Sequence, residues 1–227
     1  MSFNRRNFLK GIGLIGLGAS TPAYAEKLVP KQNAAFSLAC PPYLQNLNAE
    51  TVTICAIFNK PCLAWVEVLD ANNNTLKSVY QVEDGMRNAN AELFKFQVNH
   101  KNGQLKYKVV AKEISKFEPY KIEYAGTIQS EPFDITLPQP KQDSIHCLIL
   151  NDIHEDKDSY AYLFDKSKLA KKDLVFLNGD SFHFVTNQAD LTEKLLKPVG
   201  NKFASTIPFL MIRGNHETRG AFARDYK

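Results

Sequence analysis

The feature that most constrains the fold is a change in the spacing of apolar residues near residue 144. Before it, residues 36–137 contain short segments rich in β-branched and aromatic residues, several of which alternate in polarity. Turn signals such as DANNN at 70–74 and HKNG at 100–103 separate these segments at intervals typical of a β-sandwich. The sequence therefore predicts about seven short antiparallel strands over residues 36–137.

After residue 144 the sequence repeats a pattern of strand, polar loop and helix. Three short apolar runs predict buried strands: residues 145–150, 174–178 and 207–213. Two segments between them have the apolar spacing of helices: residues 159–173 and 188–200. Tyr160, Leu163 and Phe164 fall on one face of the first helix, and Gly200 predicts the end of the second. This alternation is typical of an α/β domain with a parallel sheet. The proline-containing segment 137–143 predicts a linker between the two parts.

A short polar segment follows each predicted strand of the α/β part, at the sheet edge where ligands bind in open α/β sheets. Asp152 and His154 carry groups that ligate divalent metals, and the Asn215 amide oxygen is a weaker ligand. Asp180, between them, has two oxygens with which it could bridge two metal ions. The alternative is that Asp152 and Asn215 only cap helices. Because the motifs recur in register at strand ends, we predict a metal site.

These motifs resemble a known family. The segments DIH, GD and GNHE, in that order, resemble the calcineurin-like metallophosphoesterases. Residues 36–137, with PPYLQNLNAETVTICAIF and NGQLKYKV, are similar to the fibronectin type III-like domain that precedes the catalytic domain of purple acid phosphatases. The resemblance implies a β-sandwich over residues 36–137, followed by an incomplete α/β metallophosphoesterase domain over residues 144–227.

The resemblance also implies a role for each polar residue. Asp152 and His154 would ligate the first metal ion, Asp180 would bridge two ions, and Asn215 would ligate the second. His216 would lie beside the substrate phosphate, where it stabilises charge or protonates the leaving oxygen. Two divalent ions about 3.5–4 Å apart hold a hydroxide and clamp both oxygens of an in-line displacement. We expect Zn, Mn or Fe, because imidazole and carboxylate ligands suit all three.

The residues around these motifs have less specific interpretations. Glu217 has no ligand role in the family pattern, and we interpret it as support behind the ligands or as charge at a helix N-terminus. His146, inside a predicted strand, and His183 are both interpreted as structural, although His183 could approach the site. Arg213 and Arg219 flank GNHE and are candidates for contact with a substrate phosphate, although such arginines more often pair with nearby acids.

The sequence departs from purple acid phosphatases at two positions. Those enzymes carry Asp-x-Gly where this chain has Asp152-Ile153-His154, and a Tyr three residues after the bridging Asp, where this chain has His183. We therefore predict a colourless enzyme without a Tyr–iron bond. The protein phosphatases of the family support the catalytic His with an Asp at the position of His183, so the resemblance does not say what orients His216.

The family pattern continues after GNHE with another His and a Gly-His-x-His segment, which this chain of 227 residues does not contain. We therefore expect a truncated fragment of an exported phosphoesterase that hydrolyses phosphate esters by a metal-bound hydroxide. The alternative is a non-catalytic exported protein whose β-sandwich binds a glycan or a protein and whose α/β part is inert.

Residues 1–25 have the order of an export signal. Arg5 and Arg6 precede a glycine-rich apolar stretch, and Ala23-Tyr24-Ala25 is an A-x-A cleavage site. The segment resembles a twin-arginine signal, which implies the twin-arginine export machinery as a partner and a periplasmic or secreted protein. An ordinary secretory signal is the alternative. The basic residues are not clustered, so the sequence does not predict nucleic-acid binding. No segment after residue 25 is long and apolar enough to span a membrane.

The cysteines leave two interpretations open. There are four: Cys40, Cys55, Cys62 and Cys147. In an exported chain they permit disulfides, with three possible complete pairings. Cys55 and Cys62 flank AIFNKP, which would be a hairpin turn between two strands. Free buried thiols are the alternative to disulfides.

Overall fold

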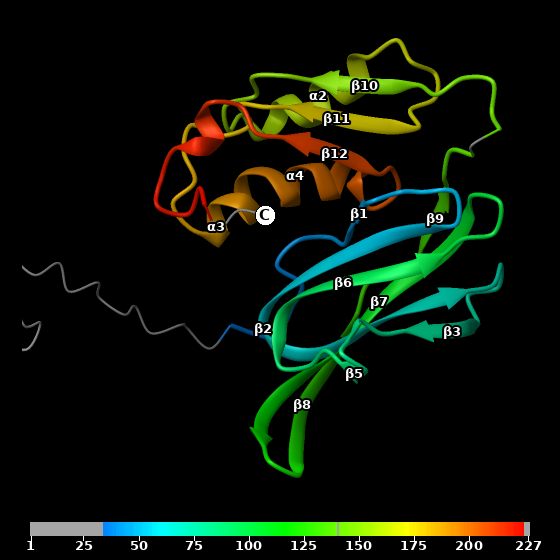
Figure 1. Ribbon diagram of the computed structural model, residues 1–227, viewed down its shortest axis with the longest axis vertical. Coiled ribbons are helices and arrows are strands. Elements are labelled where there is room, and N and C mark those ends of the chain that lie inside the picture. Colours follow the sequence, from blue (N-terminus) through cyan, green and yellow to red (C-terminus); the bar gives the residue numbers. More distant parts are fainter. Residues whose placement is uncertain (1–33, 140, 225–227) are drawn as a thin grey trace, which may run out of the picture. The chain divides into compact units, whose positions relative to one another are not determined.

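The computed structural model describes residues 34–139 and 141–224 (Figure 1). The predicted export signal, residues 1–25, lies outside the described residues. Among the helices of the described residues, none has the length and apolarity needed to cross a bilayer.

A seven-stranded antiparallel sheet occupies the amino-terminal part of the described chain. Its strands are β1 (Tyr43–Gln45), β2 (Thr51–Leu69), β3 (Thr75–Val79), β6 (Ala91–Asn99), β7 (Gln104–Glu118), β8 (Lys121–Gln129) and β9 (Phe133–Thr136). A separate two-stranded ribbon contains β4 (Val82–Glu83) and β5 (Met86–Arg87). The predicted antiparallel strands are therefore present, but β2 and β7 are much longer than the short strands that we expected.

Strand β2 runs unbroken through the segment predicted as a hairpin turn between Cys55 and Cys62, so that prediction is wrong. The first half of β2 pairs with β1 and β6, and the second half pairs with β3 and β7. The register with β6 shifts between Ile57 and Cys62. Pro61 lies at this shift. Proline has no N–H to donate to a neighbouring strand, and an irregular position of this kind is where a sheet tolerates it. The apparent turn signal therefore marks a change of partners within one strand.

Alternating apolar residues build the core of this sheet. In β6, Phe94, Phe96 and Val98 are buried, and the residues between them are exposed. Phe94 stacks on Phe96 and meets Phe58 of β2 edge-on, with ring centroids 5.8 and 5.9 Å apart. Full burial of each such aromatic ring contributes about 1.5–3 kcal/mol.

All four cysteines are free in the structure. Burial raises the pKa of Cys40 and Cys62 to about 12 and that of Cys55 to about 11. The sequence left disulfides and free thiols open as interpretations, and the structure contains free thiols.

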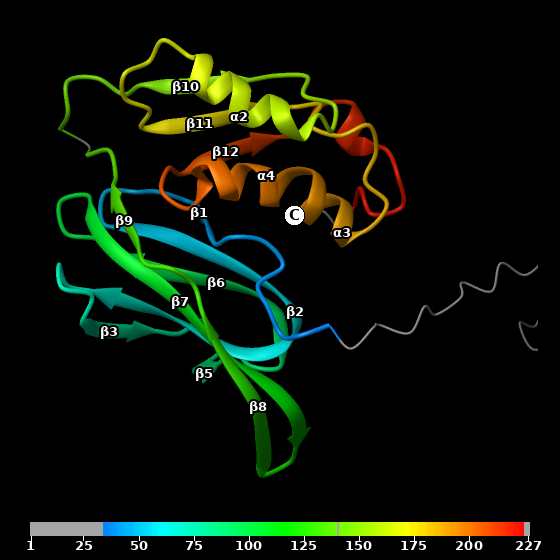
Figure 2. The same ribbon diagram turned by 180° about the vertical axis from the view of Figure 1, so that it is seen from behind.

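The α/β part contains a three-stranded parallel sheet in the order β10–β11–β12. Its strands are β10 (Cys147–Leu150), β11 (Leu174–Asn178) and β12 (Phe209–Ile212). Helix α2 (Lys157–Lys166) connects the first pair and lies in front of β10 and β11 in Figure 2. A continuous helical run connects the second pair: α3 (Gln188–Leu191), η1 (Thr192–Leu196), α4 (Lys197–Val199) and η2 (Gly200–Ala204). The predicted alternation of strands and helices is therefore present.

Gly200 does not end the second helix, contrary to the prediction. Its backbone is helical, with φ −63°, and the helical run continues to Ala204. A Cβ atom on Gly200 would lie 3.1 Å from Cβ of Pro41, closer than such atoms normally approach. The glycine therefore permits close packing on the segment before β1 instead of marking a helix end.

Helix α2 ends at Lys166, several residues before the predicted end. Tyr160 is fully buried, and Phe164 stacks on Phe203 with ring centroids 5.1 Å apart. Leu163 is 37% exposed, so the predicted buried face holds only two of its three residues.

Hydrogen bonds link the antiparallel sheet to the α/β part within the compact unit that begins at Ala35. The buried Tyr107 hydroxyl donates to the Ser205 carbonyl oxygen at 2.8 Å, and the Ser205 hydroxyl donates to the Pro42 carbonyl oxygen at 2.6 Å. Burial raises the pKa of Tyr107 well above its usual value, which keeps the hydroxyl protonated as a donor.

Candidate metal centre

The loops that follow the three parallel strands lie against one another. The His154 amide donates to the Asp180 carbonyl oxygen at 3.0 Å, and the Asp152 amide donates to the Gly179 carbonyl oxygen at 3.3 Å. The His216 amide donates to Asp180 Oδ1 at 2.9 Å. Because β11 is the central strand, its loop contacts both neighbours, and Asp180 lies between the other two motifs.

The backbone at these loops is strained. Asp152, His154 and Asp180 have φ values of 54°, 50° and 52°, in the left-handed region that non-glycine residues rarely adopt. Such conformations cost of the order of 1–3 kcal/mol each and cluster at functional sites. The three predicted ligands therefore share a conformation that the surrounding hydrogen bonds must maintain.

Three predicted ligands form the first cluster of metal-ligating atoms. Asp152, His154 and Asp180 each offer one atom, and these atoms all lie within 4.8 Å of one another. His154 Nε2 is 3.8 Å from Asp152 Oδ1. Two carboxylates and an imidazole are a donor set that suits Zn, Mn or Fe.

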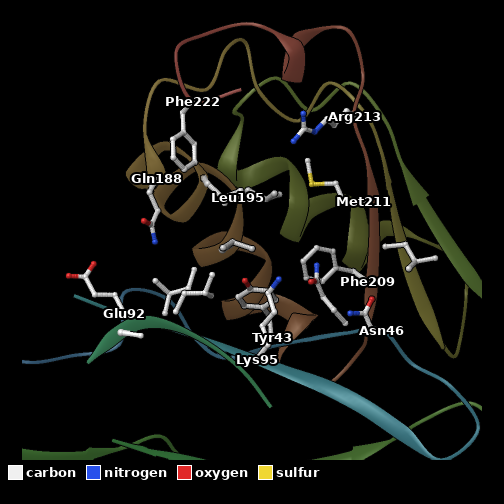
Figure 3. A pocket seen from close by; sticks show the side chains of 17 residues that line it. Tyr43, Asn46, Glu92, Lys95, Gln188, Leu195, Phe209, Met211, Arg213 and Phe222 are labelled. Atoms are coloured by element: carbon white, nitrogen blue, oxygen red, sulfur yellow. The ribbon is translucent and has the colours of Figure 1, made fainter. Parts of the chain in front are cut away.

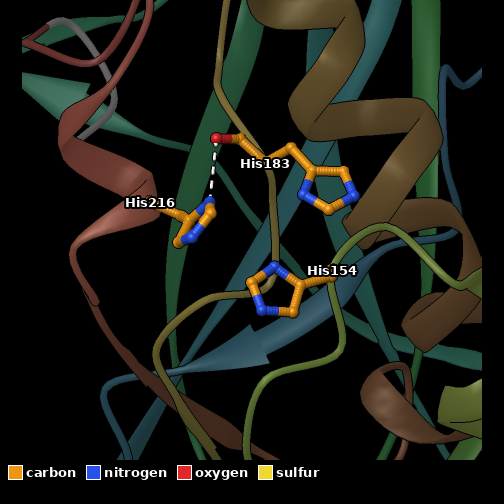
Figure 4. A group of neighbouring side chains, drawn as sticks. All are labelled: His154, His183 and His216. Atoms are coloured by element: carbon orange, nitrogen blue, oxygen red, sulfur yellow. Dashed lines mark hydrogen bonds between the residues drawn. The ribbon is translucent and has the colours of Figure 1, made fainter.

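A second cluster contains three imidazoles, from His154, His183 and His216 (Figure 4). The rings of His154 and His183 are stacked, with centroids 5.0 Å apart and planes at 17°. The His216 ring meets that of His154 edge-on at 4.6 Å. The structure therefore brings His183 to the site, against our interpretation of it as structural.

Residues 145–227 match the family model of the calcineurin-like phosphoesterases. This part of the chain is similar to that family. Among solved structures, the chain is similar to purple acid phosphatase PPD1 from yellow lupin (Lupinus luteus) seeds, with a TM-score of 0.52 and 15% sequence identity. The match covers 78% of this chain and 36% of that one, so the chain spans about a third of the length of that protein. At this identity the match shows a shared fold. No curated protein matches the chain.

Glu217 is the central support of the candidate site. Its side chain is fully buried and accepts backbone N–H groups from two loops. The donors are Asp180 at 2.9 Å, Ser181 at 2.6 Å, Phe182 at 3.3 Å and Gly214 at 2.8 Å. The interpretation of Glu217 as support behind the ligands fits this geometry. The sequence did not indicate the full burial or the number of donors.

The two candidate phosphate-binding arginines have different surroundings. Arg219 Nη1 lies 3.3 Å from His216 Nδ1. With its amide nitrogen turned toward Asp180, Asn215 donates to both Asp180 oxygens, at 2.8 and 3.2 Å, and accepts from Arg219 Nη2 at 3.0 Å. Arg219 and Asn215 therefore both lie beside the candidate ligands.

Arg213 lies elsewhere, with Nη1 donating to the Ala223 carbonyl oxygen at 2.9 Å. It lines a cavity of about 770 Å³ together with Met211, Phe222 and Tyr43 (Figure 3). No Asp or His is among the described residues of that lining. This placement gives no support to the prediction that Arg213 contacts a substrate phosphate.

His146 also lies apart from the three clustered histidines. Its backbone amide and Nδ1 lie 2.9 and 3.3 Å from Oδ2 of Asp173, which is almost fully buried. Lys171 Nζ lies 2.6 Å from the other oxygen of Asp173. These contacts fit the structural interpretation of His146.

The residues present fit a divalent metal ion. Carboxylate and imidazole groups converge, and no lysine pairs with Asp152 or Asp180 among the ion pairs of the described residues. Nδ1 of His154 is buried and makes no hydrogen bond. A buried polar atom without a partner is costly. A metal ion bound to this nitrogen, or a hydrogen-bond acceptor that faces its N–H, would remove the cost.

Proposed function

We propose that this chain is part of an exported, metal-dependent phosphoesterase that hydrolyses phosphate esters. The observation that carries the proposal is the convergence of Asp152, His154, Asp180 and His216 at the carboxyl edge of a parallel sheet. That edge belongs to the segment that matches the calcineurin-like phosphoesterase family.

Three residues would hold the first metal ion: Asp152, His154 and Asp180. Asp180 would also face a second ion together with Asn215, whose amide oxygen would have to be turned toward Asp180 to act as a ligand, in place of the nitrogen that faces it without an ion. When bound, such ions supply Lewis acidity to water and to phosphoryl oxygens. Asp180 also accepts the His216 amide, so the position of His216 is tied to the central ligand.

The structure contains a group that orients the His216 ring. His216 Nδ1 lies 3.1 Å from the His183 carbonyl oxygen. A carbonyl only accepts hydrogen bonds, so this contact assigns the proton to Nδ1. Nε2 is then the second ring nitrogen, and only in the doubly protonated ring can it donate a hydrogen bond to a phosphate oxygen or a proton to the leaving oxygen. A backbone carbonyl therefore performs the orienting role that an Asp performs in the protein phosphatases of the family.

Arg219 is the arginine that we assign to phosphate contact. Its guanidinium group adds a fixed positive charge beside His216 and presents several donors in one plane, which suits phosphate oxygens. Arg213 is not assigned this role, because its guanidinium group donates to the Ala223 carbonyl oxygen.

The function is tested by turnover with defined metals. The purified protein is loaded with Mn, Zn or Co and assayed with p-nitrophenyl phosphate as a monoester and bis(p-nitrophenyl) phosphate as a diester. We expect hydrolysis that a chelator abolishes and that Asp180→Asn lowers at least about 100-fold, since it removes a ligand. Asp143→Asn, an exposed carboxylate outside the site, is the matched control and should retain full activity. A folded, metal-loaded protein without turnover would favour the non-catalytic binding protein.

The finer parts of the proposal concern export and the amino-terminal sheet. Arg5 and Arg6, followed by the apolar stretch and Ala23-Tyr24-Ala25, support twin-arginine export to the periplasm or beyond. An Arg5→Lys, Arg6→Lys double variant should then accumulate unprocessed inside the cell, as measured by fractionation and N-terminal sequencing. For residues 36–137, the partner change within β2 supports a fibronectin type III-like sandwich.

A further inference from the structure

The position of His183 is fixed from three directions. Its amide donates to Glu155 Oε1 at 3.1 Å, and its carbonyl oxygen accepts from His216 Nδ1 at 3.1 Å. Its ring stacks on that of His154. The chain thus holds an exposed imidazole against a predicted ligand, although a freely rotating surface histidine would retain more side-chain entropy.

The carboxylate that holds the His183 amide is itself anchored. Glu155 Oε1 lies 2.9 Å from Lys194 Nζ, and the same ammonium group lies 3.0 Å from Asp190 Oδ1. This network ties the loops after β10 and β11 to the helical run at α3 and η1.

The spacing of the two stacked rings fits coordination of one ion. Two imidazoles that bind one tetrahedral ion through bonds of about 2.1 Å have ring centres about 5 Å apart. The centroids of His154 and His183 are 5.0 Å apart, and one nitrogen of each ring lies within 4.8 Å of the other. Imidazole nitrogens at this separation can bind one divalent ion.

We infer that His183 binds the same metal ion as His154. His154 is the residue shared by the cluster with Asp152 and Asp180 and the cluster with His183 and His216, so His183 would add a ligand to the Asp152–His154–Asp180 site. The inference rests on the metal site of the proposed function and adds a ligand to it. It also explains why the loop after β11 is anchored through Glu155 and Lys194, because a ligand loop must hold its imidazole in place.

The test is zinc affinity measured by competition with a chromophoric chelator, together with the visible absorption of the Co²⁺-loaded protein. We expect His183→Asn to weaken zinc binding about 100-fold or more, which exceeds the usual effect of a residue behind the ligands. The visible Co²⁺ absorption should also change in intensity and position, because one ligand is replaced. His146→Asn is the matched control, because it replaces a histidine that contacts Asp173 and lies apart from the three clustered histidines. It should match the wild type in both zinc affinity and Co²⁺ absorption.

A folding defect and a missing ligand are separated by the unfolding temperature. Metal-free His183→Asn should unfold at the same temperature as the metal-free wild type and should lose most of the stabilisation that zinc gives to the wild type. If His183→Asn keeps the zinc affinity and the Co²⁺ absorption of the wild type, His183 is not a ligand, although the proposed function stands. If the wild type and Asp180→Asn bind zinc equally weakly, the inference and the proposed function both fail.

Discussion

Glu217 Oε2 accepts the backbone amide of Asp180, and the two atoms are 2.9 Å apart. The same buried carboxylate accepts the Gly214 amide at 2.8 Å. One side chain therefore ties the loop after β11 to the loop after β12. Since Asp180 is the central predicted ligand, the geometry of the candidate metal centre depends on this carboxylate.

Glu217→Gln should destabilise the protein. The amide replaces one accepting oxygen with a donating NH2 group, which faces buried N–H donors. Leaving such a donor unsatisfied costs about 1–3 kcal/mol. The free energy of unfolding in urea should fall by at least that amount. Glu193→Gln, which removes a half-exposed carboxylate paired with Lys197, should cost under about 1 kcal/mol. Equal midpoints for the wild type and Glu217→Gln would contradict this role.

Gly214→Ala should displace Asp180. A Cβ atom at residue 214 would lie 2.2 Å from Asp180 Oδ1 and 2.6 Å from the Asp180 amide nitrogen, which is too close for either position to persist. We expect zinc affinity, measured by chelator competition, to fall about 10-fold or more, since a ligand is moved. Gly126→Ala is the control, because its Cβ would meet no atom within 4 Å. Unchanged zinc affinity in Gly214→Ala would show that Asp180 is not a ligand.

Arg219→Ala should reduce kcat/KM for a phosphate monoester. A hydrogen bond to a charged group contributes about 1.5–3 kcal/mol, which corresponds to a loss of about 10- to 150-fold. Arg213→Ala removes the same charge from the cavity wall and should leave kcat/KM near the wild-type value. The two variants exchange these outcomes if the phosphate binds at the cavity of Figure 3 instead.

Stability should fall at alkaline pH through the buried thiols. Burial raises the pKa of Cys62 from 9.0 to about 12, so the thiol stays protonated in the folded protein while the unfolded chain ionises above pH 9. The unfolded state then binds fewer protons than the folded state, and the free energy of unfolding decreases as pH rises from 9 toward 12. Each such thiol contributes about 1.4 kcal/mol per pH unit in this range.

The matched measurement compares Cys62→Ala with the wild type in urea at pH 8 and pH 10. The variant should lose less stability between these two pH values, by about 1 kcal/mol. Equal losses in the two proteins would show that the Cys62 thiol ionises with a similar pKa in both states.

The order of the elements could be read from the sequence because apolar spacing follows local geometry. Residues 174–178 were predicted as a strand, and β11 spans Leu174–Asn178. Two predictions were wrong for the same reason: the hairpin between Cys55 and Cys62, and the helix end at Gly200. In both places a local turn or stop signal serves a tertiary contact, namely the change of partners in β2 and the close approach to Pro41.

The residues of the candidate site also divide into those that could be predicted from the sequence and those that could not. Asp152, His154 and Asp180 could be proposed because they follow strands, and strand order alone brings them together. His183 and the burial of Glu217 could not, because both depend on how loops distant in sequence fold against each other. The one local signal for His183 was its spacing of three residues from Asp180, the position that carries a Tyr in purple acid phosphatases.

The most direct test of the metal centre is anomalous X-ray diffraction from crystals of the zinc-loaded protein, recorded on both sides of the zinc absorption edge. We predict an anomalous peak within bonding distance of Asp152, His154, Asp180 and the ring of His183. Crystals that show no peak there, or a peak only elsewhere, would contradict a metal centre at the carboxyl edge of the β10–β11–β12 sheet.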